Sequence, residues 1–323
     1  MRTIAILAGG DSPEYMVSVK SAEAVAEALK ERYITYTILI KGSDWYHEGT
    51  RGRACRIDKN DFSLETSEGK IRFDAVFIAI HGTPGENGLI QGYLEMLGIP
   101  YTSCKPLCSA ITFSKQACKT FLSQFEIRMA EAVMVRKEDT INTDSILSRT
   151  GIPCFVKPDD SGSSFGVTKV KDPLLLKDAL EVAFRESNTA LVEAEMRGRE
   201  VACGIVKTRN REIVFPVTEI ISRNEFFDYE AKYTPGMSDE ITPASLPDNV
   251  TERVRRLTSE IYDHLQCKGI VRVDFIIVDD EPFFLEINTV PGMTPESLLP
   301  KQAAAYGIDA GDLYSMVIED LFA

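Results

Sequence analysis

Apolar and polar residues follow two different periods along the first hundred residues. Short apolar runs are typical of buried strands, whereas apolar residues at helical spacing, such as Val19, Ala22 and Val25, are typical of a helix that packs on a sheet. The pattern predicts strands at 3–8, 34–40 and 74–80 and helices at 18–31 and 87–97. Because strands alternate with helices, we expect an α/β domain with a parallel sheet and helices on its faces.

Two of these predicted strands end in glycine-containing turns. Gly9-Gly10 follows the first strand, and His81-Gly82 follows the strand at 74–80. Ligands of open α/β sheets bind at the carboxyl ends of the strands. Both turns are therefore predicted to face a ligand.

The pattern changes after residue 103. A helical stretch at 105–125, closely spaced strands at 130–135, 152–157 and 166–170, and a helix at 174–186 indicate an α+β domain over 104–192. The remainder, 193–323, is predicted to be a third domain. Its expected elements are strands near 190–193, 200–206 and 213–217, a long polar loop at 222–248, a helix ending at 265, a strand pair at 269–278 and 282–287, and final helices around 297–306 and 310–321.

The strand pair near the C-terminus carries several polar side chains. Glu286 and Asn288 are two residues apart, so they point to one face of their strand. If the register places Asp274 opposite, three oxygen-bearing groups converge beside the guanidinium of Arg272. Oxygen ligands of this kind suit Mg²⁺, which leaves room for substrate phosphates. Taken alone, the same residues are also compatible with a polar strand face that holds one charge pair.

Charge and composition exclude several classes of protein. The net charge of −13 argues against nucleic-acid or anionic-membrane partners, because their phosphates would be repelled. Hydrophobic residues make up 44% of the chain, which is enough for several cores, and no apolar run reaches membrane-spanning length. We therefore expect a cytoplasmic protein of two or three domains, without a cleavable signal.

The seven cysteines form no CxxC pair, and the chain has three histidines, so the sequence does not favour a zinc site. Thiols of a cytosolic protein are expected to be reduced. Cys104 and Cys108, near the first predicted domain boundary, are expected to be buried residues without a chemical role.

A glycine- and serine-rich turn at 157–166 connects two predicted strands. Its lysine and its small residues suit phosphate binding, although it matches neither the Walker pattern nor GxGxxG, and such a turn alone is more often a flexible hairpin. Lys115, at the head of a helical segment, adds a second cation for phosphates. Glu193 and Glu200 add carboxylates for adenine or ribose. Together these groups predict a nucleotide site shared by the second and third domains.

The order and spacing of six motifs resemble the D-alanine–D-alanine ligases, which belong to the ATP-grasp superfamily. The motifs are LAGGDSPE at 7–14, AIHG at 79–82 with GENG at 85–88, FVKP at 155–158 with GSS at 162–164, DYEAKY at 228–233, RVD at 272–274, and EINTVPGMT at 286–294. The resemblance covers the whole chain. It implies an α/β substrate-binding domain over 1–103 and two ATP-grasp subdomains over 104–192 and 193–323.

The resemblance also implies how ATP and metal ions would bind. Two lysines and a loop would hold the phosphates: Lys115, Lys157, Ser161, Gly162, Ser163 and Ser164. Glu193 would contact the adenine amino group, and Glu200 the ribose hydroxyls. Three side chains would hold two Mg²⁺ or Mn²⁺ ions that bridge the phosphates: Asp274, Glu286 and Asn288.

The family reaction phosphorylates one D-alanine, whose acyl phosphate is then attacked by the amine of a second D-alanine. The resemblance implies catalytic roles for Glu14, Ser163, Tyr233, Arg272 and Gly292. It implies substrate contacts for His81, Lys232, Ser297 and Leu298. Glu14 would hold the first ammonium and join Ser163 and Tyr233 in a hydrogen-bonded set. Arg272 and the Gly292 N–H would stabilise the oxyanion.

Some of these residues also have simpler explanations. Glu14 is compatible with an interaction with the following helix N-terminus, and Ser297 with a helix cap. His81 is compatible with a turn residue that bonds backbone, and Lys232 with an exposed lysine. Two departures from the family pattern concern ATP affinity: Ala194 stands where lysine is common, and Asp159-Asp160 place like charges near a triphosphate.

Tyr233 favours D-alanine as the second substrate, because this position departs from tyrosine in related ligases that use D-lactate. The alternatives are a D-alanine–D-lactate or D-alanine–D-serine ligase, or an ATP-binding regulatory module without catalysis. The product would serve peptidoglycan precursors, and the resemblance implies a homodimer. We expect 222–248 to be a mobile loop that closes over the site and excludes water.

Overall fold

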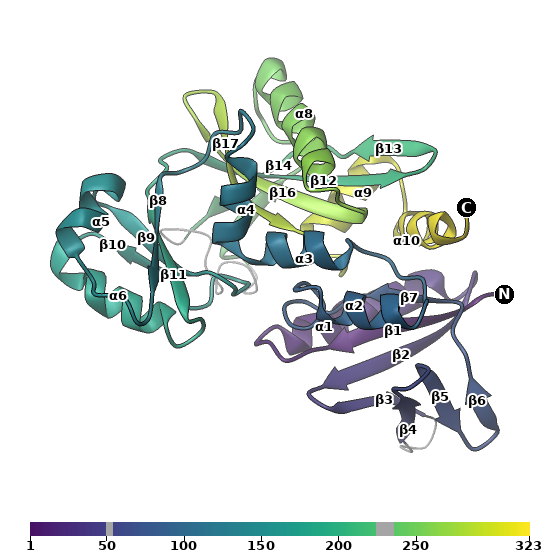
Figure 1. The fold of residues 1–323 in the computed structure, drawn as a ribbon. Helices are drawn as coiled ribbons and strands as arrows, with labels where there is room; N and C mark the ends of the chain where they lie inside the picture. The colour runs from purple at the N-terminus through teal and green to yellow at the C-terminus, as the bar shows by residue number, and fades with distance from the viewer. Residues whose placement is uncertain (50–53, 224–235) are drawn as a thin grey trace.

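The computed structural model describes residues 1–49, 54–223 and 236–323, which fold around three β-sheets (Figure 1). The first sheet is built from residues 3–78, the second from 132–194 and the third from 199–288. Helices α3 (Pro106–Phe113) and α4 (Lys115–Leu122) lead from the first sheet toward the other two. Within the described ranges, no helix has the length and apolar character needed to cross a membrane.

The N-terminal sheet has seven strands in the order β6-β5-β4-β3-β2-β1-β7. The strands are β1 (Thr3–Gly9), β2 (Ile34–Lys41), β3 (Asp44–Glu48), β4 (Ala54–Asp58), β5 (Ser63–Thr66), β6 (Gly69–Ile71) and β7 (Ala75–Ile78). β1 pairs in parallel with β2 and β7, whereas every pair from β2 to β6 is antiparallel. The prediction of a parallel sheet is therefore right for one half of this sheet and wrong for the other. Strands β3 to β6 have three to five residues each and many charged side chains, which gives them no recognisable apolar run.

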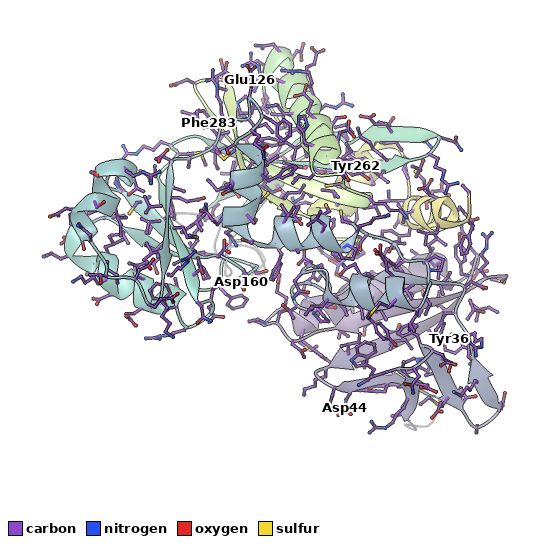
Figure 2. The ribbon with its side chains drawn as sticks, in the orientation of Figure 1. Tyr36, Asp44, Glu126, Asp160, Tyr262 and Phe283 are labelled. Atoms are coloured by element: carbon purple, nitrogen blue, oxygen red, sulfur yellow. The ribbon has the colours of Figure 1, made fainter. Side chains whose placement is uncertain are left out.

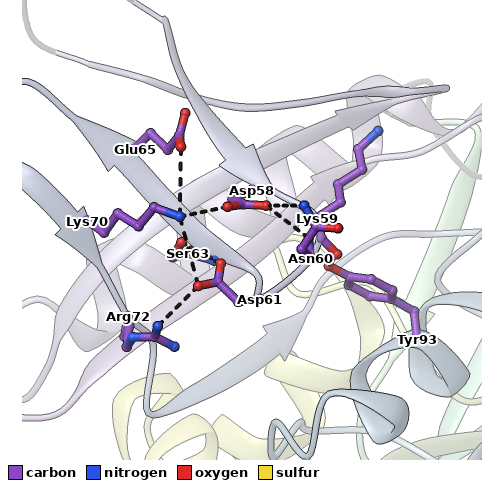
Figure 3. A network of polar contacts seen from close by, with 9 residues as sticks. All are labelled: Asp58, Lys59, Asn60, Asp61, Ser63, Glu65, Lys70, Arg72 and Tyr93. Carbon is purple, nitrogen blue, oxygen red and sulfur yellow. Dashed lines mark hydrogen bonds and ion pairs between the residues drawn. The ribbon is translucent and has the colours of Figure 1, made fainter.

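Charged residues tie the β6 edge of this sheet to its neighbours (Figure 3). Lys70 on β6 donates to Asp58 at 2.6 Å, and Arg72 donates to Asp61 at 3.1 Å. The hydrogen bond from Lys70 lowers the pKa of Asp58 to about 2. Tyr93 reaches over from helix α2 (Leu89–Met96) to the backbone of the same turn region. Exposed ion pairs add little stability, but charge along an edge strand discourages pairing with another sheet.

Helices from both ends of the chain cover one face of the N-terminal sheet. Helix α1 (Tyr15–Leu29) buries Val25 and Leu29, which are four residues apart, against Ile4 and Phe77 of the sheet. Helix α10 (Ala310–Glu319) packs beside α1, and the ring of Tyr314 meets Phe77 edge-on at 5.5 Å. Helix α2 covers the opposite face. The C-terminal helix thus completes the core of the N-terminal sheet.

The second sheet is antiparallel, with strand order β10-β9-β11-β8. Its elements are β8 (Ala132–Arg136), α5 (Thr143–Thr150), β9 (Cys154–Pro158), β10 (Thr168–Val170), a 3₁₀ turn (Pro173–Leu175), α6 (Leu176–Ala183) and β11 (Thr189–Ala194). The prediction that the strand near 190–193 belongs to the third part of the chain is wrong. β11 lies between β9 and β8, because its alternating residues Ala190 and Val192 complete the apolar core of this sheet. Helix α5 was not predicted.

The third sheet has the strand order β15-β14-β12-β16-β17, with β13 also paired to β12. Its strands are β12 (Arg199–Thr208), β13 (Arg211–Val214), β14 (Thr218–Ser222), β15 (Ser238–Ile241), β16 (Gly269–Val278) and β17 (Glu281–Asn288). Helix α8 (Asp248–His264) packs on one face through residues such as Val250, Val254 and Ile261. Helix α9 (Leu298–Tyr306) contacts β12, and a final 3₁₀ turn (Asp320–Phe322) ends the chain.

The polar loop expected at 222–248 is not continuous. β15 pairs antiparallel with β14, so residues 238–241 belong to the third sheet. Four residues with two carboxylates, Asp239 and Glu240, do not form an apolar run, which explains why the sequence pattern missed this strand. Residues 224–235, including the DYEAKY motif, lie outside the described residues.

Gln302 joins α9 to the third sheet through a buried amide. Its Nε2 donates to the Ala202 carbonyl and the Thr218 hydroxyl at 2.9 Å, and its Oε1 accepts from the Gly204 N–H at 3.0 Å.

Gln302→Leu should lower the free energy of unfolding by about 2–3 kcal/mol, because buried polar groups lose their partners. Denaturant unfolding measures the change. Ala305→Leu, at an exposed position of α9, is the control, and an equal effect of both substitutions would contradict this explanation.

Candidate active site

The pairing of β16 with β17 brings together the polar residues that the sequence singles out. Asp274 lies opposite Glu286, and Arg272 lies opposite Asn288. The register shifts between Asp274 and Phe275, so a bulge follows the carboxylate and alters the direction of the strand. Asp274 is 3% exposed. The convergence expected from the sequence is therefore present.

Arg272 and Asp274 form a bidentate ion pair. Nε and Nη2 of Arg272 donate to the two carboxylate oxygens of Asp274, each at 2.7 Å, and Nδ2 of Asn288 donates to Asp274 at 3.2 Å. The simpler alternative, a polar strand face with one charge pair, describes these contacts well. The donor set also fits a hard divalent cation, since it offers two carboxylates and an amide oxygen.

Two lysines from the second part of the chain feel the charge of Glu286, on the third sheet. Burial lowers the pKa of Lys115, and the charge of Glu286 opposes this effect. Burial also disfavours the charge of Lys157, but Glu193, then Glu286 and Glu200, outweigh it and leave the pKa of Lys157 raised. The two predicted phosphate lysines and Glu286 therefore belong to one electrostatic environment.

Glu193 is held between two lysines. Its Oε1 accepts from Nζ of Lys119 at 2.7 Å, and its Oε2 pairs with Lys157. Burial acts to raise the pKa of Glu193, but the two lysines outweigh it and bring this pKa to about 2. Glu193 therefore belongs to a buried ion-pair network that fixes Lys157.

Lys119 belongs to this ion-pair network, although it is not among the residues predicted from the sequence. It lies four residues after Lys115 on α4, and residues at this spacing share one face of a helix. It is 7% exposed, which is unusual for a lysine unless it is paired. The spacing could have suggested it, but a lysine in a short polar helix is more often on the surface.

Asp159 accepts hydrogen bonds at the start of α4. Its carboxylate accepts from the Ser114 hydroxyl and from the Gln116 N–H, both at 2.7 Å, at the N-terminus of α4. An anion is favourable at this end of a helix, and here it orients the turn that carries Lys115. Asp160 is exposed and is labelled near the centre of Figure 2.

The loop that follows β9 touches the N-terminal part of the chain. Ser163 donates to Oε1 of Glu14, and a Cβ at position 162 would meet the same carboxylate, so Gly162 permits this close approach. Ser163 and Ser164 have φ values of +47° and +61°. Consecutive N–H groups in turns of this kind can form an anion-binding concavity. Nζ of Lys115 donates to the Ser161 carbonyl at 2.6 Å, which ties the lysine to the loop.

A buried polar cluster surrounds Glu14 on the N-terminal side. Nε2 of His81 lies 3.0 Å from the Ser21 hydroxyl, and burial lowers the pKa of His81, although Glu14 opposes this effect. The Glu86 carboxylate accepts from the Gly82 N–H at 2.7 Å. Burial, and then the charge of Glu14, raise the pKa of Glu86 to about 8. His81 thus makes a side-chain contact in addition to its place in the turn, and Glu86, which has no predicted role, belongs to the same cluster.

The segment before α9 brings Gly292 and Ser297 together. A Cβ at position 292 would lie only 2.6 Å from the Ser297 hydroxyl, so glycine permits this close approach. The Ser297 hydroxyl lies 3.0 Å from the Thr294 hydroxyl. Ser297 occupies the N-cap position of α9, although its side chain makes no capping bond to the helix. Leu298, the first residue of α9, is buried.

Three other expectations have different outcomes. Glu200 lies on β12, and its charge contributes to the raised pKa of Lys157. Ala194 ends β11 and donates its N–H to the Glu131 carbonyl at 2.9 Å. Lys232 and Tyr233 lie outside the described residues, so the proposed Glu14–Ser163–Tyr233 set is seen only as its first pair.

Two family models match almost the whole chain. The model of the D-ala D-ala ligase N-terminus matches residues 3–104, and that of the D-ala D-ala ligase C-terminus matches residues 121–319. The chain belongs to the D-alanine–D-alanine ligase family. The resemblance inferred from the six motifs is thereby confirmed.

Relatives from other bacteria are similar to this family member over their full length. The chain is 50% identical over 323 residues to the D-alanine–D-alanine ligase of Phocaeicola vulgatus, and 44% identical over 323 residues to that of Bacteroides fragilis. Each alignment covers 99% of both chains. The ligase is therefore similar to these proteins in all three parts.

Solved structures of the family have the same fold. D-alanyl-alanine synthetase A from Vibrio cholerae matches with a TM-score of 0.89 at 27% identity, over 100% of this chain and 99% of that one. The VanG D-Ala:D-Ser ligase from Enterococcus faecalis matches with a TM-score of 0.87 at 30% identity, over 99% of both chains. The predicted ATP-grasp fold with an N-terminal α/β part is confirmed.

The raised pKa of Glu86 predicts a pH-dependent stability for this ligase. The folded protein keeps the Glu86 proton up to about pH 8, whereas an unfolded glutamate loses it near about pH 4.3, so stability should fall between these values. Glu86→Gln removes this titration. Relative to the unsubstituted protein, the free energy of unfolding of the variant should rise by about 1 kcal/mol per pH unit between about pH 5 and about pH 8.

Chemical unfolding at several pH values measures this gain. Glu68→Gln, at an exposed position before β6, should leave the pH dependence unchanged. A constant difference between Glu86→Gln and the unsubstituted protein over the whole interval would show that Glu86 is ionised in the folded state.

Proposed function

We propose that this protein is an ATP-dependent ligase that joins two D-alanines to D-alanyl-D-alanine for peptidoglycan precursors. The observation that carries the proposal is the pairing of Asp274 with Glu286 across β16 and β17, beside the guanidinium of Arg272. The charge of Glu286 also acts on Lys115 and Lys157. Lysines and carboxylates together suit a triphosphate with its divalent cations. The choice of D-alanine as the substrate rests on the family to which the chain belongs.

The reaction has two steps. A carboxylate oxygen of the first D-alanine attacks the γ-phosphorus of ATP, ADP leaves, and D-alanyl phosphate forms. The amine of the second D-alanine then attacks the carbonyl carbon, and phosphate leaves from the tetrahedral intermediate. Phosphorylation is needed because a free carboxylate would have to expel an oxide, which is a poor leaving group.

The ATP site lies between the second and third sheets in this proposal. Lys115 and Lys157 hold phosphate oxygens, and the loop from Ser161 to Ser164 covers them with backbone N–H groups. Glu200 is placed for the ribose hydroxyls. Glu193 serves mainly to hold Lys157 in position, as its two ion pairs support.

Two Mg²⁺ or Mn²⁺ ions would be held by Asp274, Glu286 and Asn288. Such ions neutralise the negative charge that gathers as the phosphoryl group moves. The bidentate pair with Arg272 keeps the Asp274 carboxylate in place and keeps the guanidinium beside it. Arg272 is thereby positioned to stabilise the oxyanion, together with the N–H of Gly292.

The amino acids bind on the N-terminal side. Glu14 accepts the ammonium of the first D-alanine, and its contacts with Ser163 and its proximity to His81 support this role. Ser297 and Leu298 contact the carboxylate of the second D-alanine at the start of α9. Lys232 would contact the moving phosphoryl group, and Tyr233 would complete the set with Glu14 and Ser163.

The cellular setting is also part of the proposal. We place the ligase in the cytoplasm, where ATP is available, as a homodimer of three-domain chains divided at 103 and near 193. Sedimentation measurements test the dimer, since a single species of the 35.9 kDa chain mass would contradict it.

The substrate proposal predicts ADP release with D-alanine as the sole amino acid. A coupled ADP assay compares D-alanine alone, L-alanine alone, and D-alanine mixed with D-serine or D-lactate. The VanG D-Ala:D-Ser ligase match makes D-serine the second candidate. No turnover with D-alanine alone, but turnover in a mixture, would assign the second substrate to the other compound. ATP binding without turnover in any mixture would favour a regulatory module.

The role of Arg272 predicts a loss confined to catalysis. Arg272→Met keeps an apolar stem but removes the charge, so kcat should fall by about 10²- to 10³-fold with little change in ATP binding. Steady-state kinetics and nucleotide titration separate the two quantities. Arg256→Met, at an exposed position on α8, is the control and should be near normal. A change restricted to the KM for ATP would assign Arg272 to nucleotide binding instead.

A further inference from the structure

Three cysteine thiols lie together, outside the residues proposed to bind ATP and D-alanine. The Sγ atoms of Cys104, Cys108 and Cys267 all lie within 4.8 Å of one another, and those of Cys108 and Cys267 are 3.7 Å apart. Cys104 precedes α3, Cys108 lies within α3, and Cys267 lies between α8 and β16. Three separate positions of the fold therefore converge on one point.

The spacing of these sulfurs matches that of ligands on a single metal ion. Thiolates bind Zn²⁺ at about 2.3 Å, so two sulfurs on one ion are roughly 3.8 Å apart in a tetrahedral site and roughly 4.0 Å apart in a trigonal one. The 3.7 Å separation agrees with these values, and the third sulfur needs only a small shift. We propose that Cys104, Cys108 and Cys267 form a binding site for one thiophilic d¹⁰ cation, Zn²⁺ or Cu⁺.

The surroundings suit a soft ion and not a hard one. Among the described residues, no histidine or carboxylate joins the three sulfurs in this group. Thiolates without oxygen ligands select soft cations over Mg²⁺. The Lys268 N–H donates to Sγ of Cys104 at 3.3 Å, which supports negative charge on that sulfur. Cys104 and Cys108 are buried, while Cys267 is only half-buried and gives access to the ion.

The proposed ion would join two regions that contribute to the ligase site. Cys104 directly follows the N-terminal part of the chain, and Cys267 stands two residues before β16, the strand that carries Arg272 and Asp274. A bound ion would therefore fasten α3 to the start of β16. The sequence pattern missed the site because Cys267 is 159 residues away from Cys108.

Metal titration of the full-length protein tests this site. The protein is reduced with a phosphine, stripped with a chelator, and titrated with Cd²⁺ in excess Mg²⁺, which keeps Cd²⁺ from the proposed carboxylate site. We expect one Cd²⁺ per chain, with a sulfur-to-metal charge-transfer band and a melting temperature raised by several degrees. Competition by Zn²⁺, and separately by Cu⁺ under anaerobic reduction, identifies the preferred ion.

Substitutions assign the ligands. Cys267→Ser should weaken Cd²⁺ binding at least tenfold, whereas Cys55→Ser, which removes a half-buried thiol of β4, should leave it unchanged. In the unsubstituted protein, Cd²⁺ should also protect Cys267 from alkylation, which requires no variant to fold. Absence of a charge-transfer band, equal binding by both variants, or unprotected Cys267 would overturn the proposal. The proposal would also be overturned if, after reduction and addition of metal, Cys108 and Cys267 formed a disulfide with each other and bound no ion.

Discussion

The register between β16 and β17 is the constraint on which the site depends. A one-residue slip in a strand pair turns every side chain to the opposite face. Here such a slip would separate Asp274 from Glu286 and would send polar groups into the core that Val273 and Ile287 occupy. Burial of that apolar face therefore fixes the register, and the register in turn sets the carboxylates side by side. The chemistry is positioned by hydrophobic packing behind it.

Residues with a strong local pattern were predictable from the sequence. The apolar runs around Asp274 and Glu286 identified both strands, and the two-residue spacing of Glu286 and Asn288 identified their shared face. Glu14 and Ser163 were paired through the family resemblance, and the structure brings them into contact. The motifs recognised the family, since their order along the chain is specific even where each alone is weak.

Contacts between distant or weakly patterned segments were not predictable. The four short strands between residues 44 and 71 have no apolar run of their own and depend on their neighbours for pairing. β11 belongs to the second sheet because it pairs with β8 on one side and with β9 on the other. These pairings are tertiary contacts, which a local sequence pattern does not predict. Lys119 and the pKa of Glu86 likewise depend on burial by residues far along the chain.

The packing of α10 against α1 has a consequence for how this protein folds during its synthesis. Tyr314 and Val317 fill the core beneath β1 and β7. During synthesis, the core of the N-terminal sheet therefore cannot be completed until these residues, near the C-terminus, have left the ribosome. Nascent domains usually fold from the N-terminus onward, but here the earliest sheet is finished last. A chain cut short near residue 309 would expose apolar surface at its opposite end, which would mark incomplete products for removal by quality control.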